Sequence, residues 1–141
     1  MAQDFSRKMV IVVAKGLPMW QVLNTVAHCS AQLANKMKEP FDTGVSFDTK
    51  DGVAHPRNSQ YAIVALSADP KELPALAGAA RASGLQHIGF FREMIETNDD
   101  SEIVTALAQK TEEQIEYLGV GVFGDKEAVG KLTKKFSLWK G

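Results

Sequence analysis

The stretch Met9-Val-Ile-Val-Val-Ala14, followed by Lys15-Gly-Leu-Pro18, decides the fold of this chain of 141 residues. A run of β-branched apolar residues without polar alternation is typical of a strand buried on both faces in the middle of a sheet. Gly16 and Pro18 end the strand, and from Met19 apolar residues recur at helical spacing to about Lys38. A buried strand that turns directly into a helix predicts an α/β domain.

Three further strands are predicted downstream, at Tyr61–Leu66, Gln86–Phe91 and Tyr117–Phe123. Asp69 and Pro70 are the cap and first residue of a helix that Gly84 ends, so the first two of these strands and this helix form a βαβ unit. Asp51-Gly52 between apolar residues predicts a short hairpin. We expect one α/β domain over residues 1–141 with a four-stranded core sheet.

Composition restricts the partners and the compartment. The formal charge is −1, from 16 basic and 17 acidic residues, so the total charge does not indicate a nucleic-acid or anionic membrane partner. The single cysteine, Cys29, cannot form an intrachain disulfide, which fits a reducing compartment. Because the apolar run Met9–Ala14 is far too short to cross a bilayer, we expect a cytoplasmic protein without a membrane partner.

Several motifs that could carry chemistry have simpler explanations. Gly119-x-Gly121-x-x-Gly124 matches the dinucleotide fingerprint by letter, but its first two glycines lie inside a strand and predict close helix packing. Cys29 lies on the apolar side of its helix and is interpreted as a buried, inert thiol. The histidines lack metal-ligand spacing, so the sequence predicts no metal and no cofactor: His28, His55 and His87.

The first helix is unusual because no charged residue lies between Lys15 and Lys36. Its polar residues are neutral and form one stripe: Gln21, Asn24, His28, Gln32 and Asn35. One interpretation is that the segment 41–60 or a partner subunit covers this helix, which favours a homodimer. The other is a small-molecule pocket at the start of the helix, with Trp20 stacking on the ligand and Gln21, Asn24 and free backbone N–H groups bonding to it.

A second group of candidates follows the third strand, in the segment Arg92–Asp100. Ligand sites of α/β proteins lie outside the carboxyl ends of strands, where this segment is expected. Glu93 is a candidate general base, with Thr97 bonded beside it. The neighbouring acidic residues favour the start of a helix capped by Asn98 or Asp99.

Two stretches resemble an uncharacterised family, the domain of unknown function 2000. They are Trp20-Gln-Val-Leu-Asn24 at the start of the first helix and Glu93-Met-Ile-Glu-Thr97 after the third strand. The strand Lys8–Val13, the helical Ala27-His-Cys-Ser30 and Leu118-Gly-Val-Gly-Val122 resemble type II peptidyl-tRNA hydrolases. The resemblance implies a mixed four-stranded sheet with helices on both faces, as in those hydrolases.

The site of the hydrolases is altered here. They carry a lysine-bearing Gly-Lys-Gly-Lys segment at the start of the first helix, where this chain has Met19–Leu23 without a cation, and their aspartate corresponds to Glu93. The first hypothesis is therefore a small-ligand-binding domain, which as an enzyme would hydrolyse an amide or ester with Glu93 and Asn24 as catalytic residues. Its ligand would contact Trp20, Gln21, His28 and Thr97. The alternatives are an active peptidyl-tRNA hydrolase and a non-catalytic homodimer.

Overall fold

The computed structural model describes residues 3–141. Its strands are β1 (Asp4–Ala14), β2 (Ser46–Asp48), β3 (Ala54–Pro56), β4 (Tyr61–Ala68), β5 (Gln86–Phe91), β6 (Tyr117–Asp125) and β7 (Ser137–Leu138). Its α-helices are α1 (Met19–Lys36), α2 (Leu73–Ser83), α3 (Glu93–Glu96), α4 (Asp100–Ala108) and α5 (Lys126–Thr133), with short 3-10 turns at Pro70–Glu72 and Glu112–Gln114. None of the described helices is long and apolar enough to span a membrane.

The main sheet is mixed and has the strand order β5-β6-β1-β4-β7. β1 is parallel to β4 and antiparallel to β6, β5 is antiparallel to β6, and β7 is antiparallel to β4. The predicted mixed α/β architecture is confirmed, but the predicted number of four strands is wrong because β7 adds a fifth. β7 consists of Ser137 and Leu138 alone, which is too short for any alternation pattern to reveal. β4 and β5 enclose β6 and β1, so the strands of the predicted βαβ unit are not neighbours.

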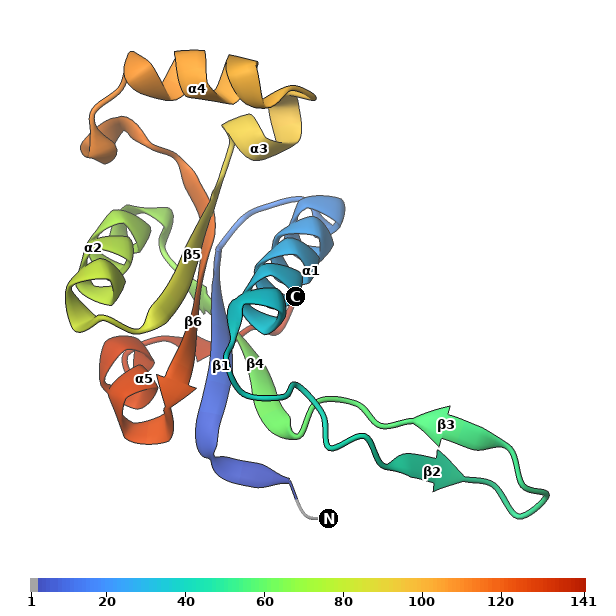
Figure 1. Cartoon of the computed structure of the whole chain (residues 1–141). Helices are drawn as coiled ribbons and strands as arrows, with labels where there is room; N and C mark the ends of the chain where they lie inside the picture. Colours follow the sequence, from blue (N-terminus) through green and yellow to red (C-terminus); the bar gives the residue numbers. More distant parts are fainter. Residues whose placement is uncertain (1–2) are drawn as a thin grey trace.

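Helices cover both faces of this sheet, as predicted (Figure 1). On one face, α2 and α5 bury Leu73, Leu76 and Val129 against the apolar side chains of the central strands. On the other face, α1 alone packs on β6, β5 and β1, with Cys29 and Leu33 in the core. The two faces therefore differ in how completely they are covered.

Two glycines of β6 determine how closely α1 packs on the sheet. A Cβ atom at Gly119 would lie 2.5 Å from Thr25 Cγ2 and 3.1 Å from the carbonyl oxygen of Val12. A Cβ atom at Gly121 would lie 2.9 Å from Leu33 Cδ1. The predicted role of these glycines in close helix packing is confirmed, and α1 is centred on β6 as a result.

The segment between α1 and β4 forms an arm, which we define as residues 42–58. The predicted hairpin is present as β2 and β3, with Gly52 at φ +91° in the turn. The arm extends away from the sheet and from α1 (Figure 1). The arm therefore does not cover the uncharged helix, so of the two predicted covers only a partner subunit is left.

Candidate functional site

The carboxyl ends of β1, β4 and β5 lie at the same edge of the sheet, next to the start of α1 and to α3 (Figure 1). The chain leaves β1 for α1 on one face and leaves the neighbouring β4 for α2 on the other face. In open α/β sheets, a crevice forms where adjacent connections part in this way, and ligands bind there. The end of the sheet where these strands terminate is therefore the candidate site, and we call it the candidate edge.

A hollow of about 520 Å³ occupies this crevice. The end of β1 contributes Ala14, Lys15 and Gly16, while Ser67 comes from the end of β4. The remaining walls are the first turn of α1 and the C-terminal segment, through Met19, Val22, Trp139 and Lys140. The hollow thus combines an apolar wall, an indole ring and two ammonium groups.

The start of α1 adds hydrogen-bond donors beside this hollow. Pro18 precedes the helix and supplies no side-chain cap, and the first turn contains no acidic residue. The N–H groups of Gln21 and Val22 donate to the carbonyl of Pro18, whereas those of Met19 and Trp20 have no acceptor within residues 3–141. Free N–H groups at a helix start favour an anionic or carbonyl oxygen.

The side chains predicted at this helix start do not line the hollow. Trp20 is 58% exposed. Gln21 is buried, and its Oε1 accepts a hydrogen bond of 3.1 Å from Arg92 Nη1. Asn24 is half-buried and makes no side-chain hydrogen bond within the described part of the chain. A hollow therefore lies on the Met19 flank of the start of α1, and the predicted Trp20, Gln21 and Asn24 do not line it.

Glu93 is a buried carboxylate with an incomplete set of partners. It is only 6% exposed, and its Oε1 lies 2.6 Å from Lys110 Nζ. Its Oε2 is buried and has no hydrogen-bond partner within residues 3–141. Burial raises the pKa of this carboxyl, but the hydrogen bond from Lys110 and the charges of Lys110 and Arg92 outweigh burial and hold the pKa below its ordinary value. Glu93 is thus an ionised acceptor that Lys110 screens from solvent.

The other two predicted residues lie on either side of Glu93. The hydroxyl of Thr97 donates to the backbone carbonyl of Glu93 at 2.9 Å, so Thr97 stabilises the short helix α3 and does not contact the carboxylate. His28 stacks on Phe90 with ring centroids 5.4 Å apart. It lines a separate, shallow groove of about 290 Å³ between α1 and α4, together with Met94 and Ile103.

Arg92 and Lys110 were not predicted as site residues. Arg92, directly after β5, places its Nε 2.6 Å from Oε2 of Glu116, directly before β6, and its Nη1 reaches Gln21 of α1. Lys110 comes from the segment after α4, and Lys140 from the end of the chain. Lys110 is far from the strand ends along the sequence, which hid it, whereas Lys15 and the C-terminal lysines are candidate cations in the sequence for the peptidyl-tRNA hydrolase alternative.

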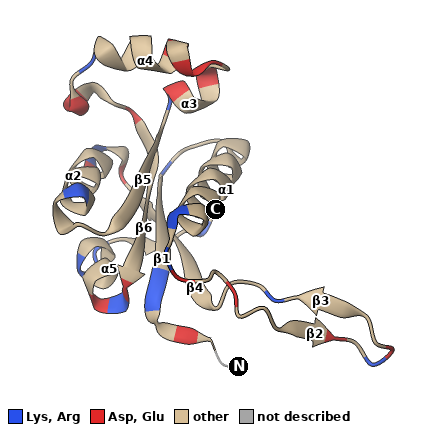
Figure 2. Ribbon diagram, in the orientation of Figure 1, with Lys and Arg blue, Asp and Glu red and all other residues tan. Residues whose placement is uncertain are grey.

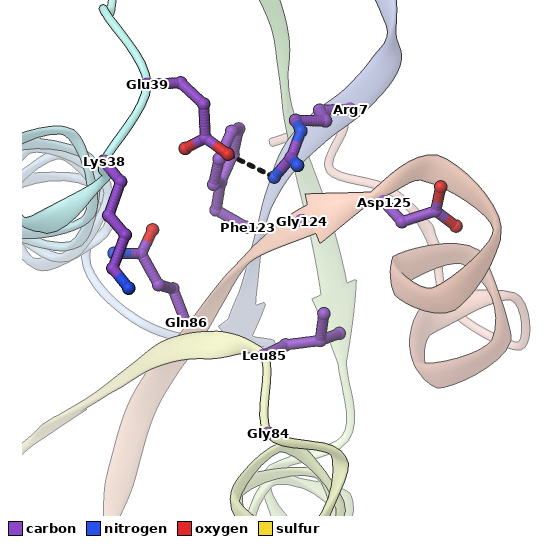
Figure 3. Close-up of a pocket in the computed structure, with 9 residues that line it drawn as sticks. All are labelled: Arg7, Lys38, Glu39, Gly84, Leu85, Gln86, Phe123, Gly124 and Asp125. Atoms are coloured by element: carbon purple, nitrogen blue, oxygen red, sulfur yellow. Dashed lines mark ion pairs between the residues drawn. The ribbon is translucent and has the colours of Figure 1, made fainter.

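A second hollow, of about 340 Å³, lies at the opposite end of the sheet (Figure 3). An ion pair of 2.5 Å between Arg7 and Glu39 forms one wall, and Lys38 reaches toward Gln86 on another (Figure 3). Its charges are balanced and it contains none of the predicted site residues. The end of the sheet with the free helix donors is therefore the stronger candidate.

Charge is distributed unevenly around the candidate edge. Carboxylates gather on α3 and at the start of α4 (Figure 2). Lys15 and Lys140 lie in the hollow instead. Within the described residues, no group of three or more His, Cys, Asp or Glu side chains is arranged to hold a metal ion.

Comparison with known proteins identifies relatives but no activity. A solved structure of a protein of unknown function from Agrobacterium tumefaciens superposes with a TM-score of 0.83 at 19% identity, over 97% of this chain and 100% of that chain. At this identity the match supports the fold alone. No curated protein matches the chain. Residues 7–140 match the family described as protein of unknown function (DUF2000), and the chain belongs to this family.

Proposed function

We propose that this chain binds a small ligand with an amide, carboxylate or other carbonyl group in the hollow between β1, β4 and the start of α1. The fold we propose for it is that of the type II peptidyl-tRNA hydrolases. The observation that carries the proposal is the hollow of about 520 Å³ at the crevice where the connections from β1 and β4 part. Ligand pockets typically measure about 300–1,000 Å³ and combine an apolar wall with few polar groups.

The ligand's oxygen would bind at the start of α1. The N–H groups of Met19 and Trp20 are free to donate, and Lys15 lines the hollow beside them. The positive end of the helix dipole and these donors favour the same kind of atom, an oxygen with negative charge or high electron density. The apolar part of the ligand would pack on Val22 and Trp139.

Glu93 is the proposed general base if the domain also hydrolyses an amide or ester. Its ionised carboxylate keeps one oxygen, Oε2, free to accept a proton from water. Glu93 does not line the hollow and its Oε2 is buried, so this role requires the ligand to extend toward α3 and the groups that cover Oε2 to move. No residue of α4 is fully buried, so its displacement disrupts little packing.

Tryptophan fluorescence tests the binding proposal, because the two tryptophans of the chain report on the two flanks of α1. In the variant Trp20→Phe, only Trp139 in the hollow remains as a reporter; in Trp139→Phe, only exposed Trp20 remains. We expect a panel of acetamide, acetate, benzamide and benzoate to include compounds that change Trp139 emission with saturation. Lys15→Gln should weaken this binding about tenfold, the loss of one charge-assisted hydrogen bond.

Lys126→Gln is the matched control, since Lys126 lies at the exposed start of α5 on the other face. If Lys15→Gln and Lys126→Gln weaken ligand binding equally, the effect comes from the loss of one positive charge anywhere on the protein and not from a contact of Lys15. If Trp139 responds to no compound while Trp20 does, the ligand binds on the flank predicted from sequence. If neither responds, the binding proposal fails.

An active peptidyl-tRNA hydrolase is the second candidate. It is supported by Lys15 and Lys140, which flank the start of α1 where that family carries its lysine-bearing segment. The carboxylates of α3 and α4 oppose it, because they would repel phosphates (Figure 2). A tRNA-binding assay at low salt decides: binding that weakens steeply with salt favours this candidate, and absence of binding excludes it.

A further inference from the structure

We propose that two copies of this chain form a symmetric dimer through the outer face of α1, with each arm resting on the partner. We define the outer face of α1 by the exposed residues Trp20, Leu23, Ala27, His28, Ala31 and Asn35 and the half-buried Asn24 between them. The proposal does not depend on the ligand site, which lies on the Met19 flank of the same helix.

The outer face is apolar at one end and neutral throughout. Trp20 is 58% and Leu23 63% exposed, and Ala27 and Ala31 continue the exposed side of the helix. Solvent-facing helices normally carry several charges, and here α4 and α5 do, whereas α2 has only Arg81. The outer face of α1 therefore has the residue composition of a protein–protein interface.

The sheet beside α1 is also uncovered. Because Gly119 and Gly121 hold α1 over β6, the helix packs on β6, β5 and β1 and leaves β4 open on this face. Ile63 of β4 is 42% exposed there, although its pairing partner Met9 on β1 is fully buried. The arm begins next to this open strand and exposes Phe47 and Val53.

The size of the helix face shows that the arm must take part. α1 has 18 residues, so it is roughly 27 Å long and about 10 Å wide, and its outer face offers roughly 270 Å². A stable interface buries about 800 Å² per partner. The open part of β4 and the arm must supply the remaining area. The arm is suited to this, because a lone two-stranded hairpin is marginally stable in water and gains from a surface to rest on.

Neutrality identifies a second copy as the partner. In a two-fold interface the same patch meets itself, so any charge near the axis faces its own like charge. Along α1 no Asp, Glu, Lys or Arg precedes Lys36, the last residue of the helix, so the outer face avoids this repulsion. A surface for a different protein gains specificity and association rate from charges, and this one has none.

The test begins with the mass of the full chain by light scattering after size-exclusion chromatography. We expect twice the chain mass of 15.4 kDa. Ala27→Glu places like charges opposite each other near the axis and should give the monomer mass. The control Val104→Glu adds the same charge on exposed α4 and should remain a dimer. Circular dichroism confirms that both variants are folded.

Cross-linking and the arm supply independent measurements. Ala27→Cys should form a disulfide between two copies under mild oxidation, whereas Val104→Cys should not. The double variant Phe47→Ser, Val53→Ser should raise the dimer dissociation constant at least about tenfold. A wild-type chain with the monomer mass at all concentrations overturns the proposal, even if it captures another protein. A dimer unaffected by Ala27→Glu overturns the assignment of this face.

Discussion

The two faces of the sheet contain similar strands but are closed differently. On one face, α2 and α5 cover the strands, and Leu76 of α2 is buried. On the other, α1 alone covers three strands and leaves Leu23 and Ile63 exposed. The first face is a completed core. The second contains the candidate ligand hollow and the proposed dimer surface, so both proposals concern the face that the chain itself leaves incompletely covered.

A matched pair of leucines should produce the largest contrast between the faces. Leu76→Ala removes a buried side chain and should lower the free energy of unfolding by about 3 kcal/mol. Leu23→Ala, on the outer face of α1, should lower it by less than about 0.5 kcal/mol in the monomer. Urea unfolding at low protein concentration measures both, and equal losses would contradict the difference between the faces.

A substitution in β6 should change how closely α1 packs on the sheet. Gly119→Val introduces a side chain against Thr25 and the backbone of Val12, which cannot move aside, so we expect a loss of about 2 to 3 kcal/mol. Gly130→Ala in α5 is the control, because the atom closest to the added Cβ is Lys8 Nζ at 3.8 Å. A loss at Gly119 no greater than at Gly130 would mean that α1 is not fixed by close approach to β6.

The buried pair at the candidate edge should make stability depend on pH. Lys110→Met leaves the Glu93 carboxylate buried without a partner and should cost about 2 kcal/mol at neutral pH, below the range of about 3 to 5 kcal/mol for fully buried pairs because Lys110 is partly exposed. Lys126→Met is the exposed control. Unfolding titrations of the three proteins measure the difference.

The sign of this dependence follows from the pKa of Glu93. Because folding lowers the pKa below its ordinary value of 4.5, the stabilisation is fully present above that pH and is lost as pH falls through the lowered pKa. Without Lys110 the carboxyl takes up a proton at higher pH. The deficit of the variant should therefore shrink on acidification, and a deficit independent of pH would show that Glu93 is not ionised in the folded protein.

Local sequence patterns predicted most of the fold. The runs of apolar residues located β1, β4, β5 and β6, and Asp69 with Gly84 bounded the helical segment of α2. These features depend on neighbouring residues only. The thiol of Cys29 is also as predicted, fully buried, and burial raises its pKa to about 12.

The candidate site was harder to predict because it depends on contacts between distant segments. The uncharged first helix was recognised. Which flank of it faces the hollow depends on how closely the helix packs on β6 at Gly119. Lys110 and Arg92 act on Glu93 and Gln21 through contacts that spacing does not encode. Trp139 reaches the hollow only because β7 pairs with β4, a pairing of two residues.

Amide NMR of the wild-type chain tests the central claim most directly, that a carbonyl-bearing ligand binds at the free N–H groups of α1 inside the hollow. Titration with acetate and benzamide should move the backbone signals of Met19 and Trp20 and the indole signal of Trp139 along saturable curves. The side-chain amide signals of Gln21 and Asn24 should stay in place. Saturable shifts confined to Gln21 and Asn24, or no shifts at any concentration, would contradict the account.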